Sequence, residues 1–147
     1  MKTEHDVASD HFVTRIELHN HLLRCDDYFI PRLSSYVDID QYVLKLYERA
    51  KKVAVFDGDR IIALGAFYIT NRNCGFITNM SVDPSFQSSG LGKRLLSLIE
   101  QELAAADVNQ LELEVFDCNS KALGFYLSNG FIVVDTNGSK KFLRKYI

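Results

Sequence analysis

The sequence has few of the features that mark a secreted, membrane-bound or nucleic-acid-binding protein. Its three cysteines are odd in number and lack a CxxC spacing, which argues for a reducing cytoplasm rather than a disulfide scaffold. No apolar run approaches the ~20 residues that span a bilayer, and the polar first residues do not resemble a signal peptide. The formal net charge of -2 lacks the basic excess of nucleic-acid binders. We therefore expect a cytoplasmic protein without nucleic-acid or membrane partners.

Proline is also scarce, with only two in 147 residues, and no repeat, low-complexity segment or linker divides the chain. Hydrophobic residues make up 47% and charged residues 24% of it, as in ordinary globular domains. This length and composition predict a single domain over residues 1–147.

The hydrophobic pattern of the first half predicts helices followed by an antiparallel meander. Residues 11–18 alternate weakly and are expected to form a strand, and residues 19–30 a short helix or turn. Apolar residues at three- and four-residue spacing over 38–52 predict a helix, with Asp38 as its N-cap. Apolar runs separated by turn residues predict three antiparallel strands over 53–82.

The second half alternates between strand and helix patterns. Helices are predicted over 91–106 and 120–130, and strands over 111–116, 131–136 and 140–147. The last strand is expected at a sheet edge, where it would support a homodimer. Together these elements predict an α/β fold: a mostly antiparallel, six- to seven-stranded sheet flanked by about four helices.

The stretch VDPSFQSSGLGKRLL, residues 82–96, places small residues and two glycines immediately before a predicted helix. The first N–H groups of a helix lack intrahelical partners and lie at the positive end of its dipole, so they favour an anion such as a phosphate. A plain strand-to-helix turn with a serine N-cap is the alternative. The sequence has no G-x-x-x-x-G-K-[ST] loop and no G-x-G-x-x-G after its first strand, which argues against NTPases, kinases and dinucleotide enzymes.

Two motifs resemble the GNAT superfamily of acyl-CoA-dependent N-acetyltransferases. The run from Gln87 to Gly92 is similar to the family's Q/R-x-x-G-x-G/A motif. The second motif is carried by Leu113, Glu114, Val115, Asn119, Leu123, Tyr126, Gly130 and Phe131. The resemblance covers roughly residues 53–147, and it implies a sheet that is splayed between its two central strands.

The resemblance implies that acetyl-CoA is the cofactor. The loop would bind its pyrophosphate, the preceding strand and Asn119 its pantetheine arm, and Tyr126 would protonate the leaving thiolate. The residues thereby assigned to coenzyme A are Met80, Ser81, Val82, Gln87, Ser88, Ser89, Gly90, Leu91, Gly92, Lys93, Asn119 and Tyr126. Serines stand at 88 and 89, where the family often has Gly and a cation, so a weaker coenzyme affinity is expected.

The catalytic residues predicted are Tyr126 as acid and Glu114 as base. Some family members carry a Glu where Phe76 stands here, and the resemblance to relatives that act on ribosomal proteins and amino acids implies a base at the position of Glu114. A structural role for Glu114, with a water chain held by Thr78 or Asn79, is the alternative. Tyr126 can instead be read as a core residue, and Asn119 as a helix cap.

The acceptor is expected between the first helices and the last two strands. Tyr28, Phe29, Arg32 and Tyr36 form the predicted substrate-binding set, which suits a small polar amine such as an amino sugar or amino acid. The resemblance implies direct attack of this amine in a ternary complex. A peptide N-terminus and a non-catalytic acyl-CoA-binding module are the alternatives. The histidine and cysteine spacings match no standard zinc pattern, so no metal is expected.

Overall fold

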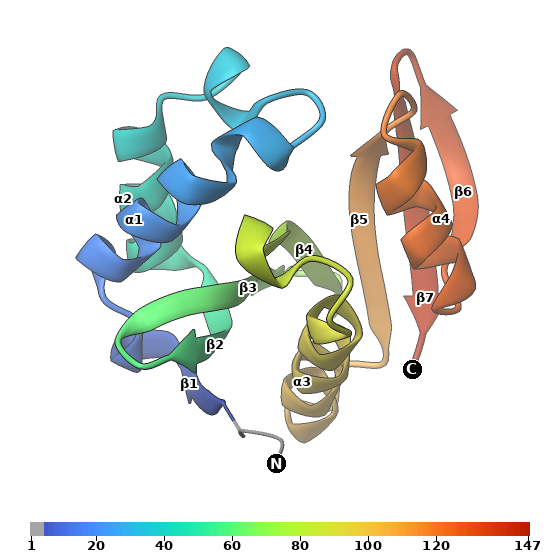
Figure 1. Cartoon of the computed structure of the whole chain (residues 1–147). Coiled ribbons are helices and arrows are strands. Elements are labelled where there is room, and N and C mark those ends of the chain that lie inside the picture. Colours follow the sequence, from blue (N-terminus) through green and yellow to red (C-terminus); the bar gives the residue numbers. More distant parts are fainter. Residues whose placement is uncertain (1–4) are drawn as a thin grey trace.

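The computed structural model describes residues 5–147 and consists of one sheet with helices on both faces (Figure 1). Within these residues the strands are β1 (Asp6–Ser9), β2 (Lys51–Asp57), β3 (Arg60–Ile69), β4 (Gly75–Val82), β5 (Gln110–Phe116), β6 (Ile132–Asn137) and β7 (Lys140–Tyr146). The α-helices are α1 (Arg15–Cys25), α2 (Ile39–Arg49), α3 (Leu91–Ala105) and α4 (Ser120–Ser128). Short 3₁₀ segments are η1 (Asp10–Phe12), η2 (Asp26–Tyr28), η3 (Leu33–Ser35) and η4 (Pro84–Phe86). No helix in this part of the chain is long and apolar enough to cross a membrane.

The strand order is β1-β2-β3-β4-β5-β7-β6, and β4 and β5 form the parallel pair in an otherwise antiparallel sheet. The predicted α/β fold with seven strands and four helices is therefore confirmed. The prediction that the last strand lies at a sheet edge was wrong. β7 pairs with β5 along its whole length, from Gln110↔Tyr146 to Phe116↔Lys140, so β6 takes the edge. The homodimer stays a prediction.

The predicted strand over residues 11–18 was also wrong, because helix α1 begins at Arg15. The side chain of Thr14 accepts a hydrogen bond from the amide of Glu17, whose carboxylate accepts one from the amide of Thr14. This capping box starts the helix. The first strand lies earlier, at β1, where it pairs with β2.

The remaining predicted elements agree with the structure to within a few residues at their ends. Asp38 caps α2 by accepting a hydrogen bond from the amide of Gln41 at 3.0 Å, as predicted. Gly58 and Gly138, with φ near +60°, close the β2–β3 and β6–β7 hairpins.

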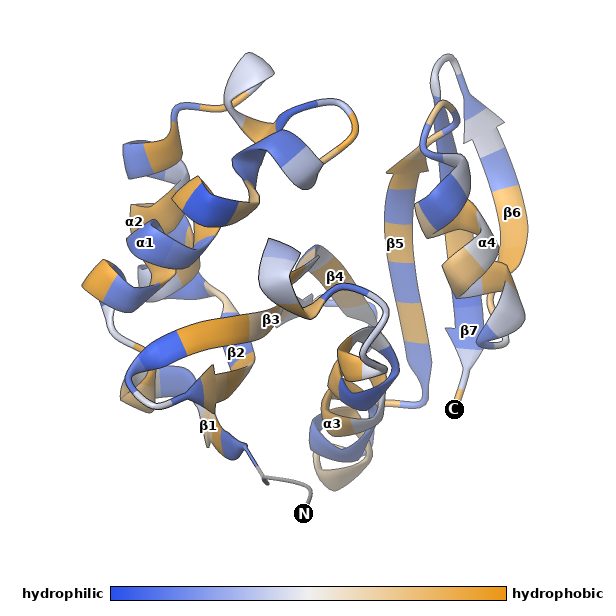
Figure 2. Ribbon diagram, viewed as in Figure 1, coloured by the Kyte–Doolittle hydropathy of each residue, from blue (hydrophilic) through white to orange (hydrophobic). Residues whose placement is uncertain are grey.

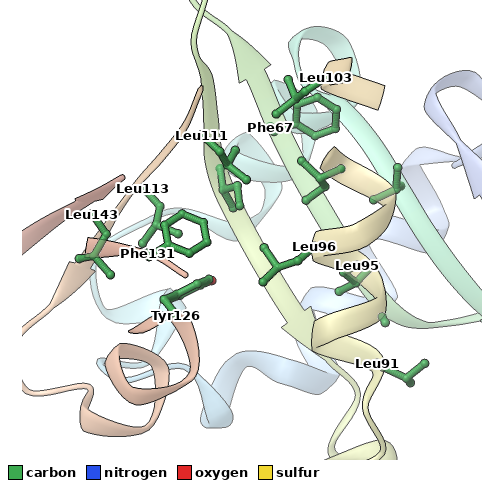
Figure 3. Close-up of a cluster of buried hydrophobic side chains, with 14 of the residues drawn as sticks. Phe67, Leu91, Leu95, Leu96, Leu103, Leu111, Leu113, Tyr126, Phe131 and Leu143 are labelled. Carbon is green, nitrogen blue, oxygen red and sulfur yellow. The ribbon is translucent and has the colours of Figure 1, made fainter. Parts of the chain in front are cut away.

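Two hydrophobic clusters cover the two faces of the sheet. Alternation along β2 sends Val53 and Val55 into the cluster with α3 and α4, and sends Ala54 and Phe56 into the cluster with α1 and α2. Figure 2 shows the same alternation along β5, where hydrophilic and hydrophobic residues take turns. The large apolar side chains of α3 and of the last strands meet in the first cluster (Figure 3).

The sheet opens between its two central strands. The β4–β5 pairing comprises only Gly75–Ile77 against Leu111–Leu113. The β3–β4 register then shifts, because Phe67 pairs with Ile77 and Ala66 with Asn79, so Thr78 is an extra residue on β4. Figure 1 shows β5 diverging from β4 beyond this point. The splayed central strands expected from the resemblance are therefore present.

Candidate active site

A pocket of about 470 Å³ lies where the two central strands diverge. Strand β4, the loop before α3, helix α4 and the segment after α1 supply its walls. All the residues predicted for coenzyme A line it, namely Met80, Ser81, Val82, Gln87, Ser88, Ser89, Gly90, Leu91, Gly92, Lys93, Asn119 and Tyr126. Two segments that are distant in sequence, 80–93 and 119–126, therefore meet around a single pocket, as the two motifs predict.

The loop before α3 leaves its backbone amides free for a ligand. Within residues 5–147, the amides of Gln87 to Lys93 donate no backbone hydrogen bond of standard geometry, although Gln87 and Ser88 lie in a turn, and the first helical bond is Arg94 N–H to Gly90 O at 3.2 Å. No side chain caps α3. The hydroxyl of Ser89 instead donates back to the carbonyl of Phe86. The serine N-cap of the alternative is therefore wrong, because Gly90 takes the N-cap position, and the residues of this loop line the pocket.

The two glycines of the loop have different reasons to be glycine. Gly90 has φ +83° and open space around its missing side chain, so the backbone there turns through a left-handed conformation beside the pocket. A Cβ on Gly92 would approach the ring of Phe125 to 3.1 Å, so this glycine allows the start of α3 to pack against α4. Ser88 also has a positive φ, +61°, without being glycine.

Tyr126 is buried in the wall that α4 provides. Its ring makes edge contacts with Phe125 and Phe131 at centroid distances of 5.2 and 5.4 Å. Figure 3 shows its hydroxyl end directed from α4 toward the Leu96 side of the cluster. No hydrogen bond from that hydroxyl to the described residues is formed, and burial raises the pKa of Tyr126 above its ordinary value. Tyr126 is therefore both the core residue of the alternative reading and a protonated hydroxyl at the pocket wall.

Asn119 has the capping role that was expected as an alternative. Its side chain accepts a hydrogen bond from the amide of Ala122 at 3.2 Å at the start of α4. It also lines the pocket, so the structure permits both predicted roles.

Glu114 lies outside the pocket lining, on the other face of β5. Leu113 and Val115 join the cluster that contains Tyr126, and Glu114 between them therefore points away from it. Its carboxylate accepts a hydrogen bond from Lys140 Nζ at 3.3 Å. The predicted base, Glu114, therefore lies on one face of β5, and the predicted acid, Tyr126 of α4, lies on the other face of the same strand.

The face that carries Glu114 also carries an aromatic contact across the opening. Tyr36, which follows η3, packs against Phe116 of β5 at a centroid distance of 5.5 Å. The ammonium of Lys140 lies 5.1 Å from the centre of the Phe116 ring. Tyr36 is thus placed beside Glu114 rather than in the pocket lining.

The other predicted substrate residues divide between the pocket and the surface. Tyr28 and Phe29 line the pocket. Arg32 does not, and its guanidinium forms an exposed ion pair with Asp27 at 2.6 Å.

The pattern that these elements form belongs to a known family. The model of the Acetyltransferase (GNAT) family matches residues 16–131. The chain belongs to the GNAT family.

Among curated GNAT relatives, the chain is similar to ribosomal protein bS18-alanine N-acetyltransferases. It is 45% identical over 53 residues to that of Salmonella typhimurium and 42% identical over 53 residues to that of Haemophilus ducreyi. The alignments cover 36% of this chain and 36–37% of the relatives. The match therefore spans little more than a third of the length of these relatives.

Solved structures show the same GNAT fold over almost the whole chain. The ribosomal-protein-S18-alanine N-acetyltransferase of Escherichia coli has a TM-score of 0.78 at 20% identity, covering 97% of this chain and 94% of that one. The PaiA N-acetyltransferase of Thermoplasma acidophilum, in complex with coenzyme A, has a TM-score of 0.76 at 18% identity, covering 97% and 99%. At these identities the likeness establishes the fold alone.

One cation of this GNAT pocket was missed by sequence reasoning. Lys121 of α4 lines the pocket opposite the loop, and its ammonium lies 3.4 Å from Gln87 Oε1. The side-chain Nε2 of Gln87 in turn donates to the carbonyl of Val82 at 2.6 Å. Lys121 stands two residues after Asn119, in the first turn of a predicted helix, and this spacing was the signal from which its place in the pocket could have been predicted. Lys121 therefore adds a cation to the pocket lining, where Ser89 stands in place of the cation that the family often has.

Among the described residues, no group of three or more His, Cys, Asp or Glu side chains is placed to hold a metal ion. His19 pairs with the exposed Asp40 at 2.9 Å, whereas His21 is fully buried. Cys25 lines the pocket, but burial raises the pKa of its thiol to about 12, which keeps it protonated and unreactive.

Proposed function

We propose that this GNAT protein transfers an acetyl group from acetyl-CoA to a free primary amine by direct attack in a ternary complex. The observation that supports this most strongly is the pocket that joins the unpaired amides before α3 to the hydroxyl of Tyr126. A ligand with an anionic end and a reactive end fits such a pocket.

The residues present fit coenzyme A at both ends. The backbone amides at the start of α3 and the positive end of its dipole suit a pyrophosphate, and Lys93 and Lys121 add two cations. Beyond Ile77, β4 has no neighbouring strand on its β5 side. Apart from the carbonyls of Thr78 and Val82, which accept hydrogen bonds from Tyr42 and Gln87, its backbone groups on that side are available to the amides of the pantetheine arm, as to an added strand.

The chemistry requires an acid for the sulfur and a base for the nitrogen. When bound, acetyl-CoA supplies a thioester whose C–S bond is replaced by the C–N bond of the product amide. Tyr126 donates its phenolic proton to the departing sulfur, and burial keeps this hydroxyl protonated until that charge develops. Glu114 accepts a proton from the acceptor ammonium, directly or through a water. Holding both reactants together supplies much of the remaining acceleration.

We infer that the acceptor is the free α-amino group of a peptide or protein. Two observations support this over a free amino acid or amino sugar. The curated relatives are named for acetylation of an alanine of ribosomal protein bS18. On the face of Glu114, an ammonium already lies between a carboxylate and an aromatic ring, since Lys140 contacts Glu114 and Phe116. Tyr36, which contacts Phe116 on this face, and Tyr28 of the pocket lining are 51% and 59% exposed and offer open aromatic surface to a chain end.

Release of coenzyme A, followed with a thiol reagent, tests the proposal. The panel contains a peptide with a free N-terminal alanine, the same peptide with an acetylated N-terminus as its matched control, free amino acids and an amino sugar. Turnover with the free peptide alone supports the proposal, and preference for a small amine overturns the acceptor class. A rise in melting temperature with coenzyme A but no turnover with any amine would favour the non-catalytic binding module.

A further inference from the structure

Two irregularities of the sheet coincide at Thr78. The pairing of β4 with β5 ends at Ile77, and the pairing of β4 with β3 skips the next residue. A bulge residue leaves backbone groups outside the regular ladder. Such groups lose free energy when they are buried without a partner, so the bulge needs hydrogen bonds from elsewhere.

Tyr42 of α2 supplies the missing partner. Its hydroxyl donates a hydrogen bond to the carbonyl of Thr78 at 3.1 Å. Its ring packs with the cluster beneath the sheet, and burial raises the pKa of the hydroxyl, which keeps it a donor. The side chain of a helix residue therefore contacts β4 at the point where its pairing with both β3 and β5 is interrupted.

Tyr42 is the first member of a buried chain of side chains. The amide of Asn79 donates to the Tyr42 hydroxyl at 3.2 Å, and the hydroxyl of Ser81 donates to Asn79 Oδ1 at 2.9 Å. His21 Nε2 lies 2.8 Å from the Ser81 oxygen. Because the Ser81 proton is directed to Asn79, the imidazole is the donor in this contact.

His21 ends the chain as a neutral ring. It is fully buried, and burial lowers its pKa to about 4. The carbonyl of Ile61 lies 3.3 Å from His21 Nδ1. It accepts a hydrogen bond from Arg24 Nη2 at 2.9 Å, so it has a donor without the imidazole. The chain thus runs in one direction of donation, from His21 on α1 to Thr78, through α2 and two residues of β4.

We propose that Tyr42 is a positioning residue that fixes the opening between β4 and β5 by holding the bulge at Thr78. Met80, Ser81 and Val82, which line the pocket, follow the bulge directly. The angle at which this segment leaves β5 therefore depends on where Thr78 is held. The inference rests on the proposed function, since it takes the opening as the place of the acyl-CoA thioester.

The fold offers a matched control for the Tyr42 hydroxyl. Tyr68 of β3 packs with the same cluster and carries a buried hydroxyl that has no hydrogen-bond partner within residues 5–147. Tyr42→Phe and Tyr68→Phe remove the same atom from the same layer. Only the first of them releases the bulge.

Hydrogen–deuterium exchange of the free protein and calorimetric titration with coenzyme A test the inference together. In Tyr42→Phe we expect faster exchange over residues 75–82 with unchanged exchange over 51–57, and a coenzyme A Kd that rises about five- to tenfold. Tyr68→Phe should change neither. Asn79→Ala, which leaves the Tyr42–Thr78 bond in place, should give a smaller change in the same direction, and it stands in for Tyr42→Phe should that variant not fold.

Unchanged exchange over 75–82 in Tyr42→Phe would overturn the inference, and so would faster exchange with an unchanged Kd. Equal effects of Tyr68→Phe would also overturn it, because loss of any hydroxyl in the layer would then suffice. If the wild-type protein binds no coenzyme A, the proposed function fails, while exchange in the free protein still decides whether Tyr42 holds the bulge.

Discussion

The two walls of the opening are built differently. On the β4 side, a chain of buried hydrogen bonds reaches from His21 to Thr78 under the strand. On the β5 side, the outermost strand β6 is exposed along all of its residues, and Tyr126 is the buried residue of α4. The β4 wall is therefore anchored by polar contacts within the fold. The β5 wall is held by one apolar cluster, and the strand beyond it is exposed to solvent.

A buried ion pair strengthens the anchored wall further. Asp83, at the end of β4, is almost fully buried and accepts a hydrogen bond from Arg24 Nε at 2.9 Å and one from the amide of Ser85. These contacts hold the pKa of Asp83 below its ordinary value despite its burial. Arg24 also reaches the carbonyl of Ile61, so α1 is fastened to both β3 and β4.

This difference follows the role of each wall in the proposed function. The β4 wall offers backbone groups, which must be held in place because no side chain can adjust to the ligand. The β5 wall offers reactive side chains, Tyr126 and Glu114, which need only a defined rotamer. Buried polar contacts therefore lie where the backbone is irregular, and apolar packing suffices where the chain is regular.

The largest effect should come from the β5 wall. Tyr126→Phe removes the proposed acid but keeps the ring and its contacts with Phe125 and Phe131. We expect kcat to fall about 10²- to 10³-fold with an unchanged coenzyme A Kd, measured by thiol release and calorimetry. Tyr47→Phe, on the exposed side of α2, serves as the control. A kcat within twofold of wild type would assign Tyr126 to packing alone.

The anchored wall should lose stability in acid. The folded-state pKa of His21 is about 4, below its ordinary 6.5. Between these two pH values the unfolded chain therefore binds a proton at His21 and the folded chain does not. The free energy of unfolding is then fully retained above pH 6.5 and falls toward pH 4, by roughly 3 kcal/mol in total. Urea midpoints across this range measure it. The lowered pKa of Asp83 adds a further loss at still lower pH.

Substitution separates this effect from general acid sensitivity. His21→Gln cannot titrate, so its stability should depend much less on pH over the same range, although its absolute stability is lower. His19→Gln, which changes a partly exposed histidine, should keep the wild-type slope. Equal slopes in all three proteins would contradict the assignment.

The loop before α3, next to the β4 wall, should show a smaller effect on stability, which arises from its backbone conformation. Ser88 adopts φ +61°, which costs a side-chain-bearing residue about 1 kcal/mol. Ser88→Gly should raise the melting temperature by about 2–4 °C. Gly90→Ala, at φ +83° with open space around it, should lower it by a similar amount. Scanning calorimetry of both variants measures the pair, and a shift of the same sign in both would show that φ is not the cause.

The smallest effect concerns the acceptor face. The ammonium of Lys140 forms an ion pair with the carboxylate of Glu114, so an acceptor ammonium has to displace the Lys140 side chain. Lys140→Met should lower the acceptor KM about two- to fivefold, because an exposed pair of this kind is worth less than about 1 kcal/mol. Lys141→Met, on the next residue of β7 and opposite Val115, should leave the KM unchanged. A raised KM in Lys140→Met would mean that Lys140 itself binds the acceptor.

Much of the fold followed from local patterns. The helix capped by Asp38, the Gly58 and Gly138 hairpins and the apolar stripe of α3 all depend on residues near each other in sequence. The capping box of Thr14 and Glu17 was equally local, but weak alternation over 11–18 obscured it. The place of β7 inside the sheet was not local, since it depends on which strand pairs with β5.

The sequence by itself determined which backbone can turn before α3 and which side chains carry hydroxyl, carboxylate and amide groups, because these depend on residue type and spacing. Only the tertiary structure decided that Lys121 would face Gln87, that Glu114 and Tyr126 would lie on opposite faces of β5, and that Tyr42 would reach Thr78. Each of these contacts joins segments at least 34 residues apart or depends on which face of a strand is covered. Such pairings are set by how whole layers pack, which no short stretch of sequence specifies.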